Sequence, residues 1–323
     1  MSLVLITGAT GFIGSWVCHH ALEAGYRVRL VVRHAQATDK LERVFSPHLD
    51  QIDFVVIPDL AVPGCFDAHL QGVEAVIHVA SPVPAQGVHD FIAPAVQGTL
   101  SVLKAALHFP SIKTVAITGS VLSVIPFGAA NSVTSVKETT EIDLSGMPAD
   151  LTDLKPQQLY HASKLCAYKA TIDFYHEHTP HFAIGVVLPS FVFGRSLYQE
   201  TPEQLNGTNQ LLYASLLKNT PFFTQYLGVH VADVAEAHIR VLRSPARGLQ
   251  SYLLSAPKRS WVDVDEFVRG TYPDLPVTLD PVALPCPTLD VSKAENELGI
   301  VFKPMEVQVA DVVDQQLELG KNA

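Results

Sequence analysis

A glycine-rich turn near the N-terminus constrains the fold more than any other stretch of the 323-residue sequence. The segment TGATGFIG places Gly8, Gly11 and Gly14 three residues apart, directly after the apolar run at 3–8. The stretch at 12–25 that follows has helical spacing and ends at a glycine. Glycines at such a turn let the backbone approach a pyrophosphate closely, and the helix N-terminus offers free N–H groups to it. The turn therefore predicts a dinucleotide-binding site rather than an ordinary connection between strand and helix.

Strand-like and helix-like segments alternate through the first 195 residues. After the first strand, apolar strand-like runs lie at 27–33, 52–58, 75–80, 114–120 and 182–194, the last of which includes an exit loop. This alternation predicts the α/β class, with a Rossmann doubly wound parallel sheet and a smaller C-terminal substrate lobe. We expect an NADP-binding Rossmann domain at 1–195 and a mainly substrate-binding lobe at 196–323. The boundary is soft, because the strand-then-helix pattern at 229–244 is expected to return to the Rossmann domain.

The end of the second strand indicates which cofactor binds. NAD sites usually carry an acidic residue there, about 20 residues beyond the glycines, to bind the ribose 2′-hydroxyl. This chain reads VVRHAQATDK, with Arg33 in that region and no acid before Asp39. A cation suits a 2′-phosphate, so the sequence favours NADP(H) over NAD. His34 and Lys40 are either helpers at the same phosphate or solvated loop residues.

The charge balance and the cysteines exclude several other classes of protein. The formal net charge is −10, which argues against nucleic-acid binding. No apolar run reaches transmembrane length and the N-terminus has no signal-peptide pattern, so no membrane association is expected. The histidines at 175–181 have no recognised zinc spacing, and no metal site is predicted. Four cysteines far apart, without a C-x-x-C pair, indicate reduced thiols in a cytoplasmic protein: Cys18, Cys65, Cys166 and Cys286.

The segment LYHASKLCAY carries the candidate catalytic chemistry. Tyr160, Lys164 and Tyr168 recur every fourth residue and so share one helix face. Ser120 ends the strand-like run TVAITGS, and ligands of open α/β sheets bind at the carboxyl ends of the strands. Tyr160 lies near the start of its helix and therefore near that edge. Tyr168 lies about 12 Å further along the helix axis, which makes it a packing residue.

Ser120, Tyr160 and Lys164 together indicate hydride transfer to a carbonyl group. A phenol has a pKa near 10, and we expect the Lys164 ammonium and the helix N-terminus to lower the pKa of Tyr160. Lys164 can also hydrogen-bond the nicotinamide ribose. Ser120 can donate a hydrogen bond to the carbonyl oxygen of a substrate, while Tyr160 protonates it as general acid.

Taken together, TGATGFIG, HVASP at 78–82, TGS, YHASK and LPSFVFG resemble the extended short-chain dehydrogenase/reductase family. The chain is most similar to the branch of dihydroflavonol reductases, cinnamoyl-CoA reductases and fungal methylglyoxal or ketone reductases. VHVADVAEAHI and LDVSKAENELGI also resemble segments of that branch, so the likeness covers nearly the whole chain. It implies an NADPH-dependent reductase of a small-molecule ketone or aldehyde, apolar and similar to a secondary metabolite, in a monomer or homodimer.

The resemblance also implies a role for individual residues. It assigns Ser120, Tyr160 and Lys164 as the catalytic triad and Arg33 to the 2′-phosphate. The other cofactor-binding residues that it implies are Gly8, Thr10, Gly11, Phe12, Ile13 and Gly14 in the turn, Asp59 and Leu60 beside the adenine, Val79, Ala80 and Ser81 along the ribose and phosphates, and Pro189 and Val192 near the nicotinamide. Lys40 is counted with the cofactor-binding residues as the helper at the 2′-phosphate. The chain departs from the branch at four positions. It has Gln97 where Asn is common and Gly119 where Ser is common. It has Leu188 and Ser190 where Asn and Gly, respectively, are common.

Other interpretations remain open. Hydroxysteroid dehydrogenases and sugar-nucleotide epimerases share Tyr-x-x-x-Lys, although Arg33 argues against an epimerase that retains NAD. A regulatory NADP-binding sensor without turnover would not need all three catalytic candidates. Phe127, Phe191, Tyr198 and Tyr226 are candidates for the substrate pocket wall. His230 is expected either to edge the pocket or to pack, and Asp233 to cap a helix or serve as a structural acid.

Overall fold

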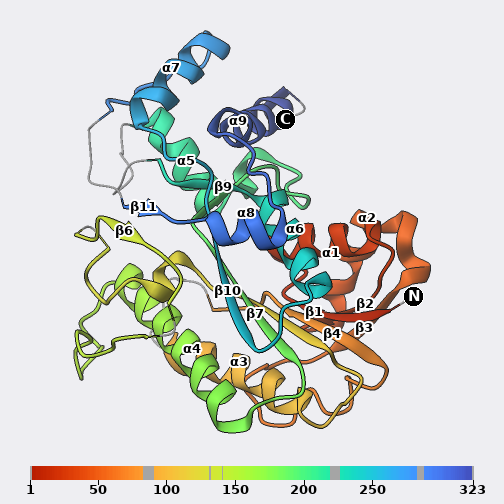
Figure 1. Ribbon diagram of the computed structural model, residues 1–323. Helices are drawn as coiled ribbons and strands as arrows, with labels where there is room; N and C mark the ends of the chain where they lie inside the picture. The colour runs from red at the N-terminus through yellow and green to blue at the C-terminus, as the bar shows by residue number, and fades with distance from the viewer. Residues whose placement is uncertain are drawn as a thin grey trace.

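A seven-stranded, all-parallel sheet forms the centre of the molecule (Figure 1). The computed structural model describes residues 2–82, 91–130, 132–139, 141–218, 226–281 and 287–321, so Cys286 lies outside the described residues. The strand order is β10-β7-β5-β4-β1-β2-β3. The strands are β1 (Leu3–Thr7), β2 (Arg27–Val32), β3 (Ile52–Val56), β4 (Val73–His78), β5 (Thr114–Thr118), β7 (Ala183–Pro189) and β10 (Leu249–Leu254). This arrangement confirms the predicted Rossmann fold.

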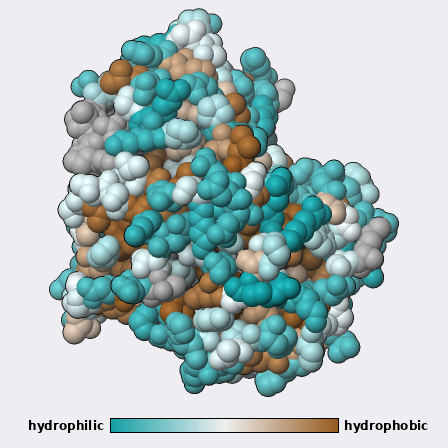
Figure 2. Space-filling view, viewed as in Figure 1, coloured by the Kyte–Doolittle hydropathy of each residue, from teal (hydrophilic) through white to brown (hydrophobic). Residues whose placement is uncertain are grey.

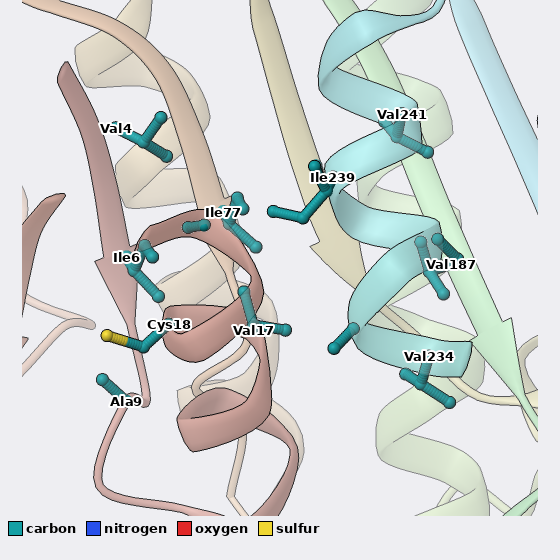
Figure 3. Packing of buried hydrophobic residues seen from close by; sticks show 14 of the residues in the cluster. Val4, Ile6, Ala9, Val17, Cys18, Ile77, Val187, Val234, Ile239 and Val241 are labelled. Atoms are coloured by element: carbon teal, nitrogen blue, oxygen red, sulfur yellow. The ribbon is translucent and has the colours of Figure 1, made fainter. Parts of the chain in front are cut away.

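Helices cover both faces of the sheet. On one face α1 (Phe12–Glu23) packs beside α6 (Val231–Arg243), and on the other α3 (Ile92–Ala106) packs beside α4 (Pro156–His178). Figure 3 shows Val17 of α1 and Ile239 of α6 over Ile77 of the sheet. Successive side chains of one strand point to opposite faces of the sheet, and helices cover both faces. Every strand residue can therefore be apolar, which explains the unbroken hydrophobic runs in the sequence.

A second cluster of helices forms the C-terminal lobe at the top of Figure 1. There α5 (Gly207–Leu217), α7 (Trp261–Thr271) and α9 (Met305–Lys321) enclose a separate apolar core. Two short parallel pairs join other segments, β8 (Phe191–Phe193) with β9 (Gly228–His230) and β6 (Ser135–Val136) with β11 (Thr288–Leu289). The remaining helices are α2 (Thr38–Val44), α8 (Ser292–Leu298) and the 3-10 turns η1 (Ala35–Ala37), η2 (Ser46–Gln51), η3 (Val121–Val124) and η4 (Pro202–Gln204).

Two features of the sheet differ from the sequence-based expectation. The edge strand β10 was not predicted, because LQSYLL contains no β-branched residue and takes its conformation from pairing with β7. The run at 182–194 was expected to be one strand with its exit loop, and that exit loop contains the second short strand β8. The chain changes partner at Ser190, whose N–H donates to Leu254, while the N–H of Phe191 donates to Leu227.

The surface and the thiols complete the description of the fold. Hydrophilic residues cover most of the face shown in Figure 2. In the described part of the chain, no helix is long and apolar enough to cross a membrane. Cys18, Cys65 and Cys166 carry free thiols, and Cys18 is buried in the core between α1 and the sheet.

Candidate active site

The turns that follow four neighbouring strands meet at one edge of the sheet. Thr7 at the end of β1 pairs with His78 at the end of β4, and Thr118 at the end of β5 pairs with Val187 of β7. Because the strands are parallel and in register, their carboxyl ends lie side by side. The glycine turn, the segment at 79–81, Ser120 and Pro189 therefore share this edge.

The glycine turn has the geometry that a pyrophosphate needs. Gly8 adopts φ +77°, and a Cβ there would lie 2.7 Å from the backbone nitrogen of Ala80. A Cβ on Gly14 would overlap the carbonyl oxygen of Gly8. Gly11 caps α1 without any side chain, and the first turn of α1 contains no acidic residue. Thr10 and Gly11 are exposed, so the N-terminus of α1 is open to an anion and fits the phosphates of a dinucleotide.

The residues assigned to the adenosine end lie beyond β2 and β3. Val31 of β2 pairs with Thr7, so Arg33 stands beside the glycine turn with an exposed side chain. Asp59 is exposed and its carboxylate accepts a hydrogen bond from the backbone N–H of Ala61 at 2.8 Å. Lys40 is not a solvated loop residue. It belongs to α2, and its Nζ lies 4.1 Å from the centre of the Tyr198 ring.

The other residues assigned to the cofactor divide between backbone and side-chain positions. The backbone N–H of Ala80 donates to Thr7 Oγ1 at 3.2 Å, which holds the segment at 79–81 beside the glycine turn. Ser81 points toward α4, where its Oγ accepts a hydrogen bond from Lys164. Leu60 lies next to Gly98 of α3. Four residues are buried or half-buried around the edge: Phe12, Ile13, Pro189 and Val192.

Ser120, Tyr160 and Lys164 come together from two elements. Ser120 follows β5 and caps η3, where its Oγ accepts a hydrogen bond from the N–H of Leu122 at 3.2 Å, so its own proton remains available to a second partner. Tyr160 lies in the second turn of α4, and its phenol shares a side-chain hydrogen bond with Ser120. Lys164 places its Nζ 5.4 Å from the centre of the Tyr160 ring. Tyr160 therefore lies between a hydroxyl donor and a cation.

Burial sets the protonation states of this group. It raises the pKa of the Tyr160 phenol, and the hydrogen bond with Ser120 opposes that rise. The expectation that Lys164 would lower this pKa below its ordinary value is wrong, because removal of a phenolate from water costs more than its neighbours return. Burial also lowers the pKa of Lys164 to about 8. At neutral pH Tyr160 keeps its proton and Lys164 keeps most of its charge, as a general acid and its cationic neighbour require.

Neighbouring side chains hold these groups in place, and sequence reasoning missed the histidines among them. Lys164 Nζ donates to Ser81 Oγ at 2.9 Å. His161, next to Tyr160 in the chain, donates from Nε2 to the carbonyl of Ile125 at 2.9 Å and so ties α4 to the turn after Ser120. A cavity of about 20 Å³ adjoins Lys164 and is lined in part by His78 and Thr118. His161 lies within the motif YHASK and His78 within HVASP, but neither motif indicates what its buried side chains contact.

The second phenol of α4 and two neighbouring histidines have structural roles. Tyr168 is 3% exposed and donates to the carbonyl of Thr139 at 3.1 Å, which agrees with a packing role. His78 Nδ1 lies 2.9 Å from Thr7 Oγ1, and burial together with the charge of Lys164 lowers the pKa of His78 to about 4. His238 of α6 bonds Thr118 Oγ1 at 2.7 Å and is buried and neutral.

Some candidates for the pocket wall lie elsewhere. Tyr226 is buried in the core of the C-terminal lobe, where its hydroxyl donates to Gln308, so it is not a wall residue. Tyr198 packs on the glycine turn. Asp233 is the structural acid rather than a helix cap, since it accepts bonds from the backbone and Nζ of Lys303.

His230 caps α6 and bonds Asp311 at 2.8 Å. Among the departures from the branch, Ser190 is buried, and its hydroxyl donates to Ser255 at 3.2 Å, which links the end of β7 to the end of β10. Phe127 is partly exposed and lies 5.5 Å from His161, ring centre to ring centre. Phe127 therefore remains a candidate for the wall beside Tyr160.

Comparison with known proteins identifies the family. The model of the NAD dependent epimerase/dehydratase family matches residues 4–255. The chain belongs to this family, the extended short-chain dehydrogenase/reductases that the motifs indicated. It is similar to the ketoreductase sphI of Aspergillus fumigatus, with 36% identity over 333 residues and 98% of each chain covered.

Two solved structures are also similar over nearly their whole length. Gre2 from Candida albicans in complex with NADPH has a TM-score of 0.82 and 26% identity, with 99% of each chain covered. The yeast methylglyoxal/isovaleraldehyde reductase Gre2 complexed with NADPH has a TM-score of 0.85 and 23% identity, covering 99% of this chain and 100% of that one. At that identity the second likeness shows the shared fold.

Proposed function

We propose that the protein is an NADPH-dependent carbonyl reductase acting on an apolar ketone or aldehyde similar to a secondary metabolite. The observation that carries this proposal is the meeting of Ser120, Tyr160 and Lys164 beside a glycine turn built for a dinucleotide. The likeness to a ketoreductase and to an NADPH-bound reductase supports it. We further propose that the enzyme works in the cytoplasm as a monomer or homodimer.

Each residue of the group has a separate task in the proposed reaction. NADPH, when bound, supplies the hydride for the carbonyl carbon. Ser120 donates its free proton in a hydrogen bond to the carbonyl oxygen and orients the substrate. Tyr160 transfers its phenolic proton to that oxygen. Lys164, fixed by Ser81, supplies positive charge that stabilises the phenolate left behind.

The alternatives fit the site less well. An epimerase that retains NAD does not need a cation at the ribose 2′ position, and we assign Arg33, which follows β2 beside the glycine turn, to that position. A sensor without turnover would not need a phenol, a hydroxyl and a buried ammonium brought together at one edge of the sheet. A hydroxysteroid dehydrogenase would use the same group, and only the substrate distinguishes it from the proposed reductase.

The proposal is tested by following NADPH oxidation against a panel of ketones, aldehydes and flavonoid-like carbonyls, with NADH measured in parallel. We expect turnover of an apolar carbonyl with kcat/KM higher for NADPH than for NADH. Arg33→Ala should reduce that preference by roughly tenfold, because a charge-assisted bond to the 2′-phosphate is lost. Arg27→Ala is the matched control, since Arg27 contacts Asp53 at the far end of β2. Equal efficiency with both cofactors in the unaltered enzyme would contradict the assignment of Arg33.

The pH dependence of reduction should follow Lys164. Since burial lowers the pKa of this ammonium to about 8, it is charged below that pH and loses its charge above it. We expect kcat/KM to be constant from about pH 6 to 7.5 and to fall up to about tenfold per unit above pH 8. Lys164→Arg, which stays charged, should remove this basic limb from whatever activity remains. A rate that stays constant to pH 10 in the unaltered enzyme would rule out this role for Lys164.

A further inference from the structure

A short segment, residues 195–200, connects the C-terminal lobe to the glycine turn, and we call it the 195–200 strap. Its first residues are fixed on α9. The side chain of Gln315 accepts from the N–H of Ser196 and donates to its carbonyl, both at 2.8 Å. Arg195 forms a paired ion contact with Glu318, with its Nη1 at 2.8 Å. The indole of Trp16 in α1 donates to the carbonyl of Arg195 at 2.7 Å. The strap is therefore held from two sides.

Tyr198 is the residue of the strap that contacts the glycine turn. Its hydroxyl donates to the carbonyl oxygen of Ala9 at 2.7 Å. Ala9 is fully buried and Tyr198 is 8% exposed, so solvent does not replace this bond. Burial raises the pKa of Tyr198, which keeps the phenol protonated as a donor. Since Ala9 follows Gly8 directly, the bond fixes a peptide group inside the turn that receives the pyrophosphate.

The ring of Tyr198 also holds a cation. Lys40 Nζ lies 4.1 Å from the ring centre, well within the range of a cation–π contact. Lys40 is half-buried, and burial lowers its pKa. Glu200, at the end of the strap, also attracts this ammonium. One aromatic side chain thus sets the position of both the turn and the cation nearest to it on α2.

We propose that Tyr198 is a positioning residue for cofactor binding. Its hydroxyl fixes the Ala9 carbonyl, and its ring holds Lys40 on the side of the turn where Arg33 receives the 2′-phosphate. The inference rests on the proposed function, which places NADPH at this edge. It also assigns a cofactor role to a segment expected to belong to the substrate lobe.

The two contacts of Tyr198 are separable by calorimetric titration of the purified full chain with NADPH and with NADH. Tyr198→Phe keeps the ring but leaves the buried Ala9 carbonyl without a donor, so both affinities should fall by roughly tenfold in the same proportion. Tyr198→Leu also removes the ring. NADPH affinity should then fall by about a further threefold or more, while NADH affinity changes no further, because only NADPH carries the 2′-phosphate.

Two other variants make the result decisive. Tyr272→Phe, which loses a bond to Asp314 in the C-terminal lobe, is the matched control and should leave both affinities unchanged. Lys40→Met changes a half-buried helix residue that should not be needed for folding, and it should lower only the affinity for NADPH.

The outcomes distinguish this inference from the proposed function. Affinities of Tyr198→Phe equal to those of the unaltered protein would overturn the role of its hydroxyl. If Arg33→Ala reduces the preference for NADPH but Lys40→Met and Tyr198→Leu do not, the role of the ring is wrong while the cofactor assignment stands. If none of the three alters the preference, the proposed 2′-phosphate site itself is wrong.

Discussion

Replacing Tyr160 by phenylalanine should lower kcat/KM for carbonyl reduction by roughly 10²–10⁴-fold, because the general acid is lost. The ring that faces Lys164 at 5.4 Å remains, and only the hydroxyl that bonds Ser120 is removed. The cofactor site should therefore keep its shape. We expect NADPH affinity, measured by calorimetric titration, to stay within about threefold of the unaltered protein.

Tyr168→Phe is the matched control for this experiment. It removes a phenol from the same helix that bonds the carbonyl of Thr139, on the packed side of α4. A loss of about 1 kcal/mol in the free energy of unfolding is expected, with reduction retained. Full activity in Tyr160→Phe would refute the assignment, and loss of NADPH binding in that variant would indicate a structural role instead.

Replacing Gly14 by alanine should weaken NADPH binding strongly. The new Cβ would overlap the carbonyl oxygen of Gly8, and Gly8 cannot retreat because it lies against the backbone of Ala80. Overpacking of this kind costs about 1–3 kcal/mol, which corresponds to roughly 10–100-fold in affinity if the turn absorbs the distortion. Calorimetric titration with NADPH measures the loss of affinity. Thermal unfolding measures how far the same change lowers the stability of the fold.

Gly270→Ala provides the control for a glycine in a helix. This residue is exposed in α7, and a Cβ there would meet nothing within 4 Å. The change should raise stability slightly, by up to about 1 kcal/mol, and leave NADPH binding unchanged. If Gly14→Ala bound NADPH as well as this control does, the close packing at Gly8 would not be needed for the cofactor.

The family and the Rossmann fold could be predicted because their signals are local. The glycines lie within one turn, and each apolar run before residue 121 largely coincides with one strand. Tyr160 and Lys164 are one helical turn apart, so their shared face follows from spacing alone. Ser120 could be added because parallel strands present their ends at one edge. The catalytic assignment of these residues stays a prediction, to be tested by the variants above.

The rest depended on contacts between distant parts of the chain. Tyr198 and Ala9 are 189 positions apart, and no pattern in either segment indicates that they meet. The pKa of Tyr160 was misjudged for a related reason. Sequence spacing places a lysine nearby, but it does not reveal how far the phenol is removed from water. The strand β10 was missed because its conformation comes from β7 rather than from its own residues.

The order of elements along the chain has a consequence for folding during synthesis. The glycine turn and all three catalytic candidates are translated before residue 165. Yet α6, which covers α1, and β10, which completes the sheet, come only at residues 231–254. A nascent chain that ends near residue 195 would expose the apolar face of α1 and the unpaired edge of β7, both prone to aggregation. Ribosome-bound chains of this protein should therefore depend on chaperones until β10 has emerged.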